Sequence, residues 1–194
     1  MYDFIEGKIV KLTPANAVLN CNGIGFFINI SVYTYEKLKI NETARLHVHQ
    51  VISEDSHNLF GFYTEKEREV FRQLISVSGV GANTARVLLS SLSEDTIINA
   101  IIRKDAPLLQ SVKGIGPKAA QRIILELYDK IAKAVSGTET HQGGIVNTFE
   151  EALQALMALG FVRANAEKAL LNASKELGND TSTEKLVKNA FKYL

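Results

Sequence analysis

Cysteine is almost absent from this chain of 194 residues, in which Cys21 is the only one. One cysteine cannot form an intramolecular disulfide, an iron–sulfur cluster or a zinc finger with cysteine ligands. The sequence also lacks an apolar run long enough to span a membrane. Residues 1–6 carry acids where a signal peptide would carry basic residues. These absences predict a cytoplasmic protein that does not associate with membranes.

Sequence signatures of catalysis are missing as well. The P-loop pattern Gly-x4-Gly-Lys-Ser/Thr does not occur, so we expect no ATP hydrolysis by that route. No nucleophile stands in a recognisable spacing with a general base. His47 and His49 share one face of an expected strand, but a metal site needs further ligands, and we interpret both as ordinary surface residues. We therefore expect a non-enzymatic protein without a cofactor or a metal ion.

The net charge of +1 conceals an uneven distribution along the chain. Residues 1–63 hold five Lys/Arg against six Asp/Glu, and residues 136–194 hold six against seven. Residues 64–135 hold eleven against eight, so the excess positive charge lies in the central segment. A surface that binds phosphates is expected there.

The N-terminal third of the chain, residues 1–63, has the pattern of a β domain. Short apolar segments are separated by turn-forming residues, and Asn22-Gly23 is a strong signal for a type I′ hairpin turn. Five or six strands in about sixty residues predict a small closed barrel such as an OB-fold. The expected strands are 2–5, 8–12, 17–21, 25–30, 44–51 and 58–63.

Residues 64–135 have the pattern of an all-α domain. It begins at a capping box in which Thr64 and Glu67 each satisfy an otherwise free backbone amide. The expected helices are 65–76, 82–91, 94–102, 105–111 and 117–134.

A glycine motif occurs twice within this α domain. Gly79-Val80-Gly81 is repeated as Gly114-Ile115-Gly116, 35 residues later, and the flanking sequences repeat too. A single Gly-x-Gly before a helix often serves only tight packing, whereas two matched copies indicate a duplicated structural unit.

The duplicated motif predicts two helix–hairpin–helix elements that bind phosphate. Glycine allows the turn to approach a ligand closely, and the following helix directs free N–H groups and the positive end of its dipole toward an anion. Two such sites suit the two strands of a duplex, and they contact backbone rather than bases. Lys113, Lys118, Arg86 and Arg122 surround the hairpins and are candidates to pair with phosphates.

The C-terminal part of the chain predicts a small adaptor. Residues 136–147 are polar and rich in glycine, as is typical of a flexible linker. Residues 148–194 predict a three-helix, UBA-like domain with helices at 149–159, 163–176 and 183–193. Gly160 is the expected C-cap of the first helix, after which Phe161 either packs back or protrudes.

Glu54 and Asp55 lie in the expected turn between two apolar strands. Such a pair is most often a solvated acidic turn. The alternative is a pair of carboxylates that face DNA phosphates and repel the strands from one point.

The order of these parts resembles the RuvA family of bacterial Holliday-junction-binding proteins, over essentially the whole chain. The resemblance rests on Ile52-Ser53-Glu54-Asp55 followed by Leu59-Phe60-Gly61-Phe62, on the two glycine hairpins, and on Ala158-Leu159-Gly160-Phe161. It implies an α+β multidomain protein with an OB-fold barrel, a tandem helix–hairpin–helix domain and a C-terminal three-helix domain. It further implies a homotetramer that binds four-way junction DNA in recombination, repair and the SOS response.

The resemblance also assigns roles to residues. Glu54 and Asp55 match the acidic pin of the family, which lies at the crossover, and the C-terminal domain is expected to bind a RuvB-type hexameric ATPase, with a RuvC-type resolvase as a further partner. The expected contacts with that ATPase are Leu156, Leu159, Phe161 and Phe191. The expected DNA-binding residues are Gly79, Val80, Gly81, Ala82, Asn83, Thr84, Gly114, Ile115, Gly116, Pro117, Lys118, Ala119 and Arg122. The first hairpin departs from the family pattern, because Ala82-Asn83 replaces the common Pro-Lys and removes one cation.

Two other functions fit parts of the pattern. A helix–hairpin–helix DNA repair glycosylase or nuclease would need a catalytic Asp or Lys after the hairpin, and the positions of Lys118 and Asp129 do not form a recognised spacing. A barrel that binds RNA or single strands would need aromatic stacking positions and would prefer single strands.

Overall fold

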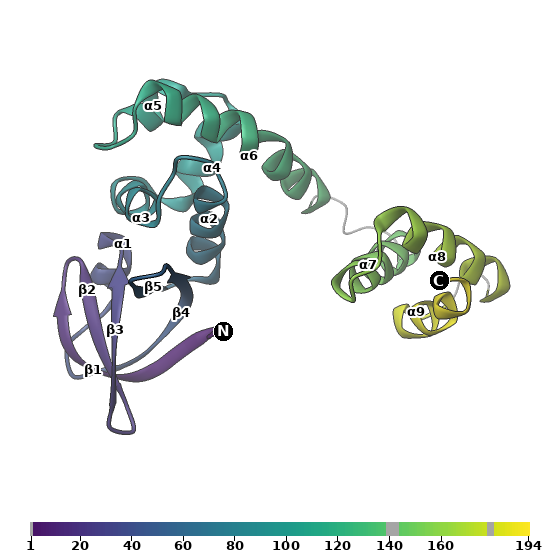
Figure 1. Cartoon of the computed structure of the whole chain (residues 1–194), viewed down its shortest axis with the longest axis horizontal. Helices are drawn as coiled ribbons and strands as arrows, with labels where there is room; N and C mark the ends of the chain where they lie inside the picture. The colour runs from purple at the N-terminus through teal and green to yellow at the C-terminus, as the bar shows by residue number, and fades with distance from the viewer. Residues whose placement is uncertain (1, 139–143, 178–180) are drawn as a thin grey trace. The chain divides into compact units, whose positions relative to one another are not determined.

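The computed structural model describes residues 2–138, 144–177 and 181–194, with side chains described outside 133–147. The chain divides into two compact units, residues 1–135 and 136–194. The first unit contains both the barrel and the helices that carry the glycine motifs (Figure 1).

Five strands close into the expected barrel, in the order β1-β2-β3-β5-β4. The strands are β1 (Phe4–Thr13), β2 (Asn16–Cys21), β3 (Ile24–Ile30), β4 (Thr43–Ile52) and β5 (His57–Phe62). Only β3 and β5 run parallel among these pairs. The two segments expected at 2–5 and 8–12 are one continuous strand, because β1 pairs with β4 over its first half and with β2 over its second.

The barrel interior is filled by alternate side chains, as expected of strands with one buried face. Ile9, Leu19, Ile28 and Leu46 are completely buried there. The turn at Asn22-Gly23 has positive φ at both residues (51° and 92°), which confirms the type I′ hairpin.

A short helix that the sequence analysis missed, α1 (Val32–Lys37), follows β3. Ser31 is its N-cap and accepts a hydrogen bond from the Thr34 N–H at 3.0 Å. Both residues are completely buried. The helix is too short for hydrophobic periodicity to reveal it, and the cap was its only sequence signal.

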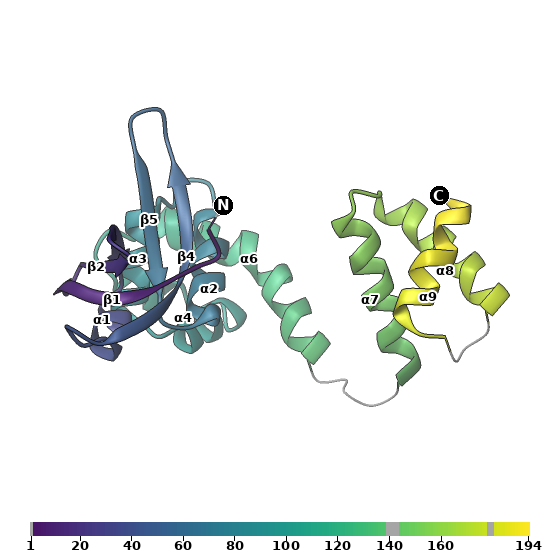
Figure 2. The ribbon, with the colours of Figure 1, turned by 90° about the horizontal axis from the view of Figure 1, so that it is seen from below.

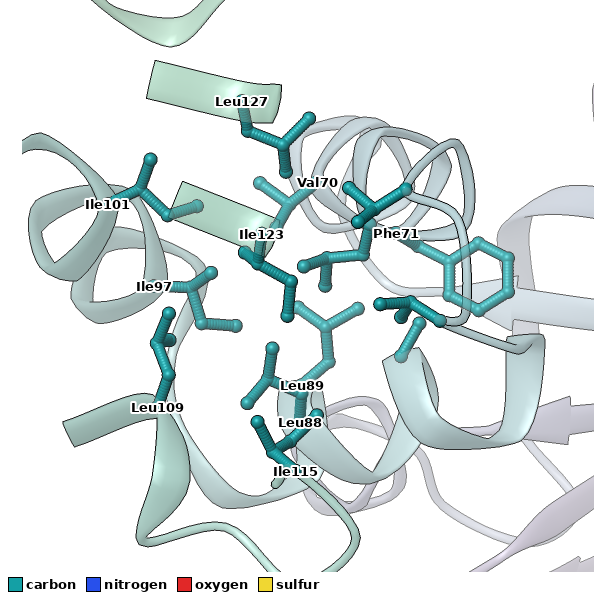
Figure 3. Packing of buried hydrophobic residues seen from close by; sticks show 14 of the residues in the cluster. Val70, Phe71, Leu88, Leu89, Ile97, Ile101, Leu109, Ile115, Ile123 and Leu127 are labelled. Atoms are coloured by element: carbon teal, nitrogen blue, oxygen red, sulfur yellow. The ribbon is translucent and has the colours of Figure 1, made fainter. Parts of the chain in front are cut away.

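The central helices agree closely with expectation. They are α2 (Glu65–Ile75), α3 (Ala82–Ser91), α4 (Glu94–Ile102), α5 (Ala106–Gln110) and α6 (Pro117–Thr138). Their apolar faces converge on one core, in which Leu88, Ile97 and Ile123 are completely buried (Figure 3). No described helix combines the length and apolar content that crossing a bilayer requires.

The barrel and the helices share part of this core. Phe60 and Phe62 of β5 lie on the outer face of the barrel, and their rings pack against the ring of Phe71 on α2 at centroid distances of 5.1 and 4.8 Å. All three side chains are at most 3% exposed. The apolar packing therefore joins the two parts into one folding unit.

Polar contacts reinforce this joint at other places. On α2, Arg68 donates to the backbone O and the carboxylate of Asp3, which precedes β1. On α3, Ser90 Oγ accepts from the Val32 N–H at 3.1 Å. Both helices are thus tied to the barrel at positions that lie far apart in the sequence.

The capping box at Thr64 and Glu67 forms only in part. Thr64 Oγ1 accepts from the Glu67 N–H at 3.0 Å, as expected of an N-cap. The Glu67 carboxylate instead accepts from Ser31 Oγ, from Thr34 Oγ1 at 2.8 Å and from the Tyr63 N–H. It is therefore buried against α1, where those donors are available, rather than exposed at the helix end.

The second unit contains α7 (Gly144–Ala158), α8 (Arg163–Leu177), α9 (Thr183–Ala190) and the 3-10 turn η1 (Phe191–Tyr193). Its core includes Leu153, Leu156, Leu170 and Leu186. Because α6 continues to Thr138 and α7 begins at Gly144, helices occupy both ends of the linker expected at 136–147. Its residues 139–143 lie outside the described part of the chain.

Candidate nucleic-acid interface

The repeated glycine motif folds into two copies of the same turn. The first copy lies between α2 and α3, and the second lies between α5 and α6. Gly79 and Gly114 have φ of 87° and 96°, a conformation that favours glycine. In each copy the central residue donates its N–H to the residue three positions earlier: Val80 to Val77 O at 3.0 Å and Ile115 to Val112 O at 3.1 Å. The sequence repeat is therefore a repeat of backbone geometry.

The central residues of the two hairpins serve to hold this geometry. Val80 and Ile115 are each only 5% exposed, and their side chains lie in the core of the helical domain. Their N–H groups are already used within the turn. Both side chains therefore anchor the turns that present their neighbours, and contact of Val80 and Ile115 with DNA stays a prediction.

The flanking glycines are not there for tight packing. A Cβ placed on Gly81, Gly114 or Gly116 would meet no described atom within 4 Å. For Gly79 the nearest described atom is Nη1 of Arg122, at 3.7 Å. The space beside both hairpins is thus open, as a surface that a ligand approaches closely must be.

Each hairpin leads directly into a helix N-terminus. The Gly81 O accepts from the Ala85 N–H at 2.9 Å, and the Gly116 O accepts from the Ala120 N–H at 3.0 Å, so the equivalent carbonyl opens each helix. The amides of the first turn have no partner within their own helix and can donate to an anion. Those amides belong to the expected DNA-binding residues Ala82, Asn83, Thr84, Lys118 and Ala119, and Pro117 begins the second helix without an N–H.

The cations near the hairpins separate into two groups. Arg122 on α6 donates from Nη1 to the Ser78 O at 3.0 Å and lies 3.3 Å from Ser78 Oγ, so the second copy's helix places a cation at the first hairpin. Lys118 is exposed. Arg86, by contrast, donates to the backbone O of Ala15 at 2.8 Å. The expectation that Arg86 pairs with phosphate is corrected, because it binds the barrel.

The acidic turn, Glu54 and Asp55, lies at the tip of the β4–β5 hairpin, which extends beyond the rest of the barrel (Figure 2). Both carboxylates are exposed. Ser53 donates its N–H to the Ser56 O at 2.9 Å, and its hydroxyl bonds to the Asp55 carboxylate at 2.9 Å. The turn is thus an ordered projection that carries negative charge away from the barrel.

Both histidines of β4 are partly buried. The described residues contain no cluster of three or more His, Cys, Asp or Glu side chains suited to a metal ion. His49 is partly buried, and its ring lies 5.8 Å from that of Phe71 on α2, so it is a packed rather than a freely exposed residue. Burial lowers the pKa of His49, and the nearby charges of Arg72 and Arg68 lower it further.

The candidate partner-binding residues of the second unit differ in exposure. Leu156 is completely buried, so its expected role as a direct contact is corrected to a role in the core. Leu159 is 62% exposed and Phe191 is 48% exposed. Phe161 is half-buried and packs edge-on against Phe191 at 6.0 Å, which answers whether it packs back or protrudes. Val162, which follows directly and which no sequence pattern singled out, is 67% exposed.

A carboxylate on α8 holds the C-terminal turn in place. Glu176 accepts hydrogen bonds from Asn189 Nδ2 and from the Tyr193 hydroxyl, both at 2.8 Å. These two bonds and the charge of Lys192 lower the pKa of Glu176. The position of Phe191 therefore depends on a polar network as well as on ring packing.

A small β-barrel joined to two open glycine hairpins defines the class of the protein, a tandem helix–hairpin–helix DNA-binding protein. Comparison with known families agrees: residues 1–61 match the RuvA N-terminal domain, residues 71–129 a SAM-like helix-hairpin-helix tandem, and residues 147–194 the RuvA C-terminal domain. The chain belongs to the RuvA family.

Full-length relatives support the same assignment. A protein of Bacteroides fragilis is 43% identical over the whole of both chains, and one of Flavobacterium psychrophilum is 42% identical over the whole of both. A third, from Cytophaga hutchinsonii, is 42% identical over 99% of each chain. All three bear the name Holliday junction branch migration complex subunit RuvA. This family does not support the glycosylase or nuclease alternative.

The open space at Gly116 allows a direct test of backbone approach. Gly116→Ala puts a methyl group into empty space, so we expect the free energy of unfolding to fall by no more than about 1 kcal/mol, the usual cost at a helix N-cap. Affinity for DNA should fall about tenfold, equivalent to about 1.4 kcal/mol, because the methyl group occupies the space of a phosphate. Thermal unfolding and fluorescence anisotropy with labelled DNA measure the two quantities.

Gly25→Ala, on the exposed part of β3, is the matched control and should change neither quantity. Gly114→Ala is less informative, because its φ of 96° adds backbone strain. Unchanged DNA affinity in the Gly116→Ala protein would contradict binding through the hairpin amides.

Proposed function

We propose that this protein binds four-way DNA junctions and acts as the DNA-binding subunit of a branch-migration complex in recombination and repair. The observation that carries the proposal is the presence, in one compact unit, of two equivalent open hairpins and a projecting acidic turn. The names of the full-length relatives support it.

The hairpins supply affinity without sequence selectivity. Backbone amides and the positive ends of α3 and α6 attract phosphate oxygens, which are the same for every base sequence. Lys118 and Arg122 add positive charge. Their contribution to affinity is larger at low salt, because each phosphate neutralised releases counterions. Arg122 also supplies a cation to the first hairpin, where Asn83 stands at the position equivalent to Lys118.

The acidic turn supplies the preference for a branched structure. Placing carboxylates next to the phosphates of a continuous duplex is unfavourable, since like charges at close range repel. At a four-way junction the strands separate around a centre, where Glu54 and Asp55 can lie between them. Several copies of the chain around that centre, as in a homotetramer, would place one acidic turn per arm and would hold the junction open.

The protein is proposed to work with catalytic partners rather than to catalyse. The sequence has no P-loop, so the work of moving DNA falls to a RuvB-type hexameric ATPase, and cleavage falls to a RuvC-type resolvase. Leu159, Phe161 and Phe191 on the second unit are the proposed contacts for the ATPase, together with Val162. A contiguous exposed apolar patch is typical of a docking surface, and Phe161 and Phe191 are in contact here.

The proposed function is tested by comparing a four-way junction with linear duplexes of the same arm sequences at one fixed salt concentration. We expect the junction to bind at least about a hundredfold more tightly, equivalent to about 2.7 kcal/mol. The preference should survive scrambling of the arm sequences, because phosphates and shape are recognised. Equal affinity for junction and duplex, or a preference for single strands, would contradict the proposal.

Two leucines test the docking surface. Leu156 lies on α7, and Leu159 lies three residues later, just after the C-terminal end of α7. Leu159→Ser should leave the free energy of unfolding within about 0.5 kcal/mol of wild type and should weaken binding to the ATPase in a pull-down. Leu156→Ser should instead destabilise the second unit by about 2–5 kcal/mol, since it removes a completely buried side chain. Val10→Ser, an exposed apolar position in the other unit, is the control. Full ATPase binding by the Leu159→Ser protein would exclude this surface.

A further inference from the structure

A carboxylate that pairs with no cation among the described residues lies buried where the barrel meets the helical domain. Glu67 is completely buried on α2, and so are Ser31 and Thr34, whose hydroxyl groups donate to it from the barrel side. The Tyr63 N–H also lies 3.3 Å from its Oε2. The network therefore connects the first turn of α2 to the barrel at two places. One is α1 with its N-cap Ser31, and the other is Tyr63 at the end of β5.

This network is a costly way to stabilise a joint. Burial raises the pKa of Glu67, while the hydrogen bonds from Ser31, Thr34 and the Tyr63 N–H favour the ionised form. The adjacent cation, Arg68, pairs with Asp3 and Glu65 in the structure as described. Packed apolar groups usually stabilise such a site at least as well as a buried charge does. The carboxylate instead fixes an orientation, because its hydrogen bonds are satisfied in only one arrangement of the barrel relative to the helical domain.

The same network lies at the end of the strand that leads to the acidic turn. Tyr63 immediately follows β5, and β5 leads straight from the acidic turn to the joint. At about 3.3 Å per residue, the turn stands roughly 20 Å from the network, so a tilt of about 10° there displaces the turn by about 3 Å. A shift of that size is enough to move a carboxylate from a position between two DNA strands to one that clashes with a strand.

We propose that Glu67 is a positioning residue that fixes the acidic turn relative to the two glycine hairpins and thereby sets the preference for junctions over linear duplex. The inference rests on the proposed function. Glu67 contacts no DNA; it acts through Ser31, Thr34 and Tyr63 on the direction of the β4–β5 hairpin.

The geometry is tested by measuring one distance in the full-length protein. Cys21, the only cysteine, is replaced by serine, and spin labels are attached to cysteines introduced at His57, beside the acidic turn, and Asn99, on α4. Pulsed dipolar spectroscopy then gives the distribution of distances between the labels. We expect a narrow distribution in this labelled background, and one broadened or shifted by about 3 Å when Glu67→Gln is added. A residue that only stabilised the fold would leave this distribution unchanged.

The consequence for binding is tested with the unlabelled proteins. Glu67→Gln should lower the ratio of junction affinity to duplex affinity about tenfold, with duplex affinity itself within about twofold of wild type. Glu69→Gln, the same change at an exposed position on the same helix, is the matched control and should alter neither affinity. Neutralising the acidic turn with Glu54→Gln and Asp55→Asn should change junction affinity less in the Glu67→Gln protein than in wild type, because the two sites are coupled.

Thr34→Val serves as the second variant if Glu67→Gln does not fold. It keeps the shape and removes a hydroxyl that donates to Glu67 and accepts from the Tyr63 N–H at 2.9 Å. An unchanged distance distribution in the folded variant would overturn the inference. So would a changed distribution with an unchanged affinity ratio. A wild-type protein without any junction preference would overturn the proposed function as well, whereas a failure confined to the Glu67 and Thr34 variants would overturn this inference alone.

Discussion

Phe71 packs against Phe60 and Phe62, and this contact makes the barrel and the helical domain a single body. Removing one such buried ring typically costs about 3–5 kcal/mol, a large share of the stability of a small domain. Arg68, Arg86 and Ser90 add polar contacts along the same boundary. Without this joint, the acidic turn and the hairpins would belong to two modules whose spacing varies.

Within that body, contacts beside the hairpins and the acidic turn hold each of these features in shape. Val80 and Ile115 occupy the core and thereby leave the adjacent glycines open to solvent. β4 and β5 carry the acidic turn away from the barrel, and Ser53 orders its backbone. In the proposed function, the two hairpins attract phosphate and the acidic turn repels it at one point, an arrangement that fits a branched nucleic acid better than a continuous one.

The sequence predicted the parts that depend on local patterns. Turn signals such as Asn22-Gly23 revealed the barrel, and the repeat at Gly79 and Gly114 revealed the paired hairpins. Features set by tertiary contacts were missed or misassigned. The chain order does not show that Arg86 reaches Ala15 or that Glu67 turns toward α1. Likewise, Leu156 and Leu159 lie three residues apart, and only the packing of α8 and α9 shows that one is core and the other surface.

Hydroxyl-radical footprinting of all four strands of a junction tests most directly whether one rigid body presents these features together. Hairpins held at a fixed spacing from the acidic turn should protect one short stretch of backbone on each arm, at the same distance from the crossover in every arm. The crossover itself should stay reactive, and the protected positions should not move when the arm sequences are exchanged. Protection centred on the crossover, or protected positions that follow the base sequence, would contradict this account.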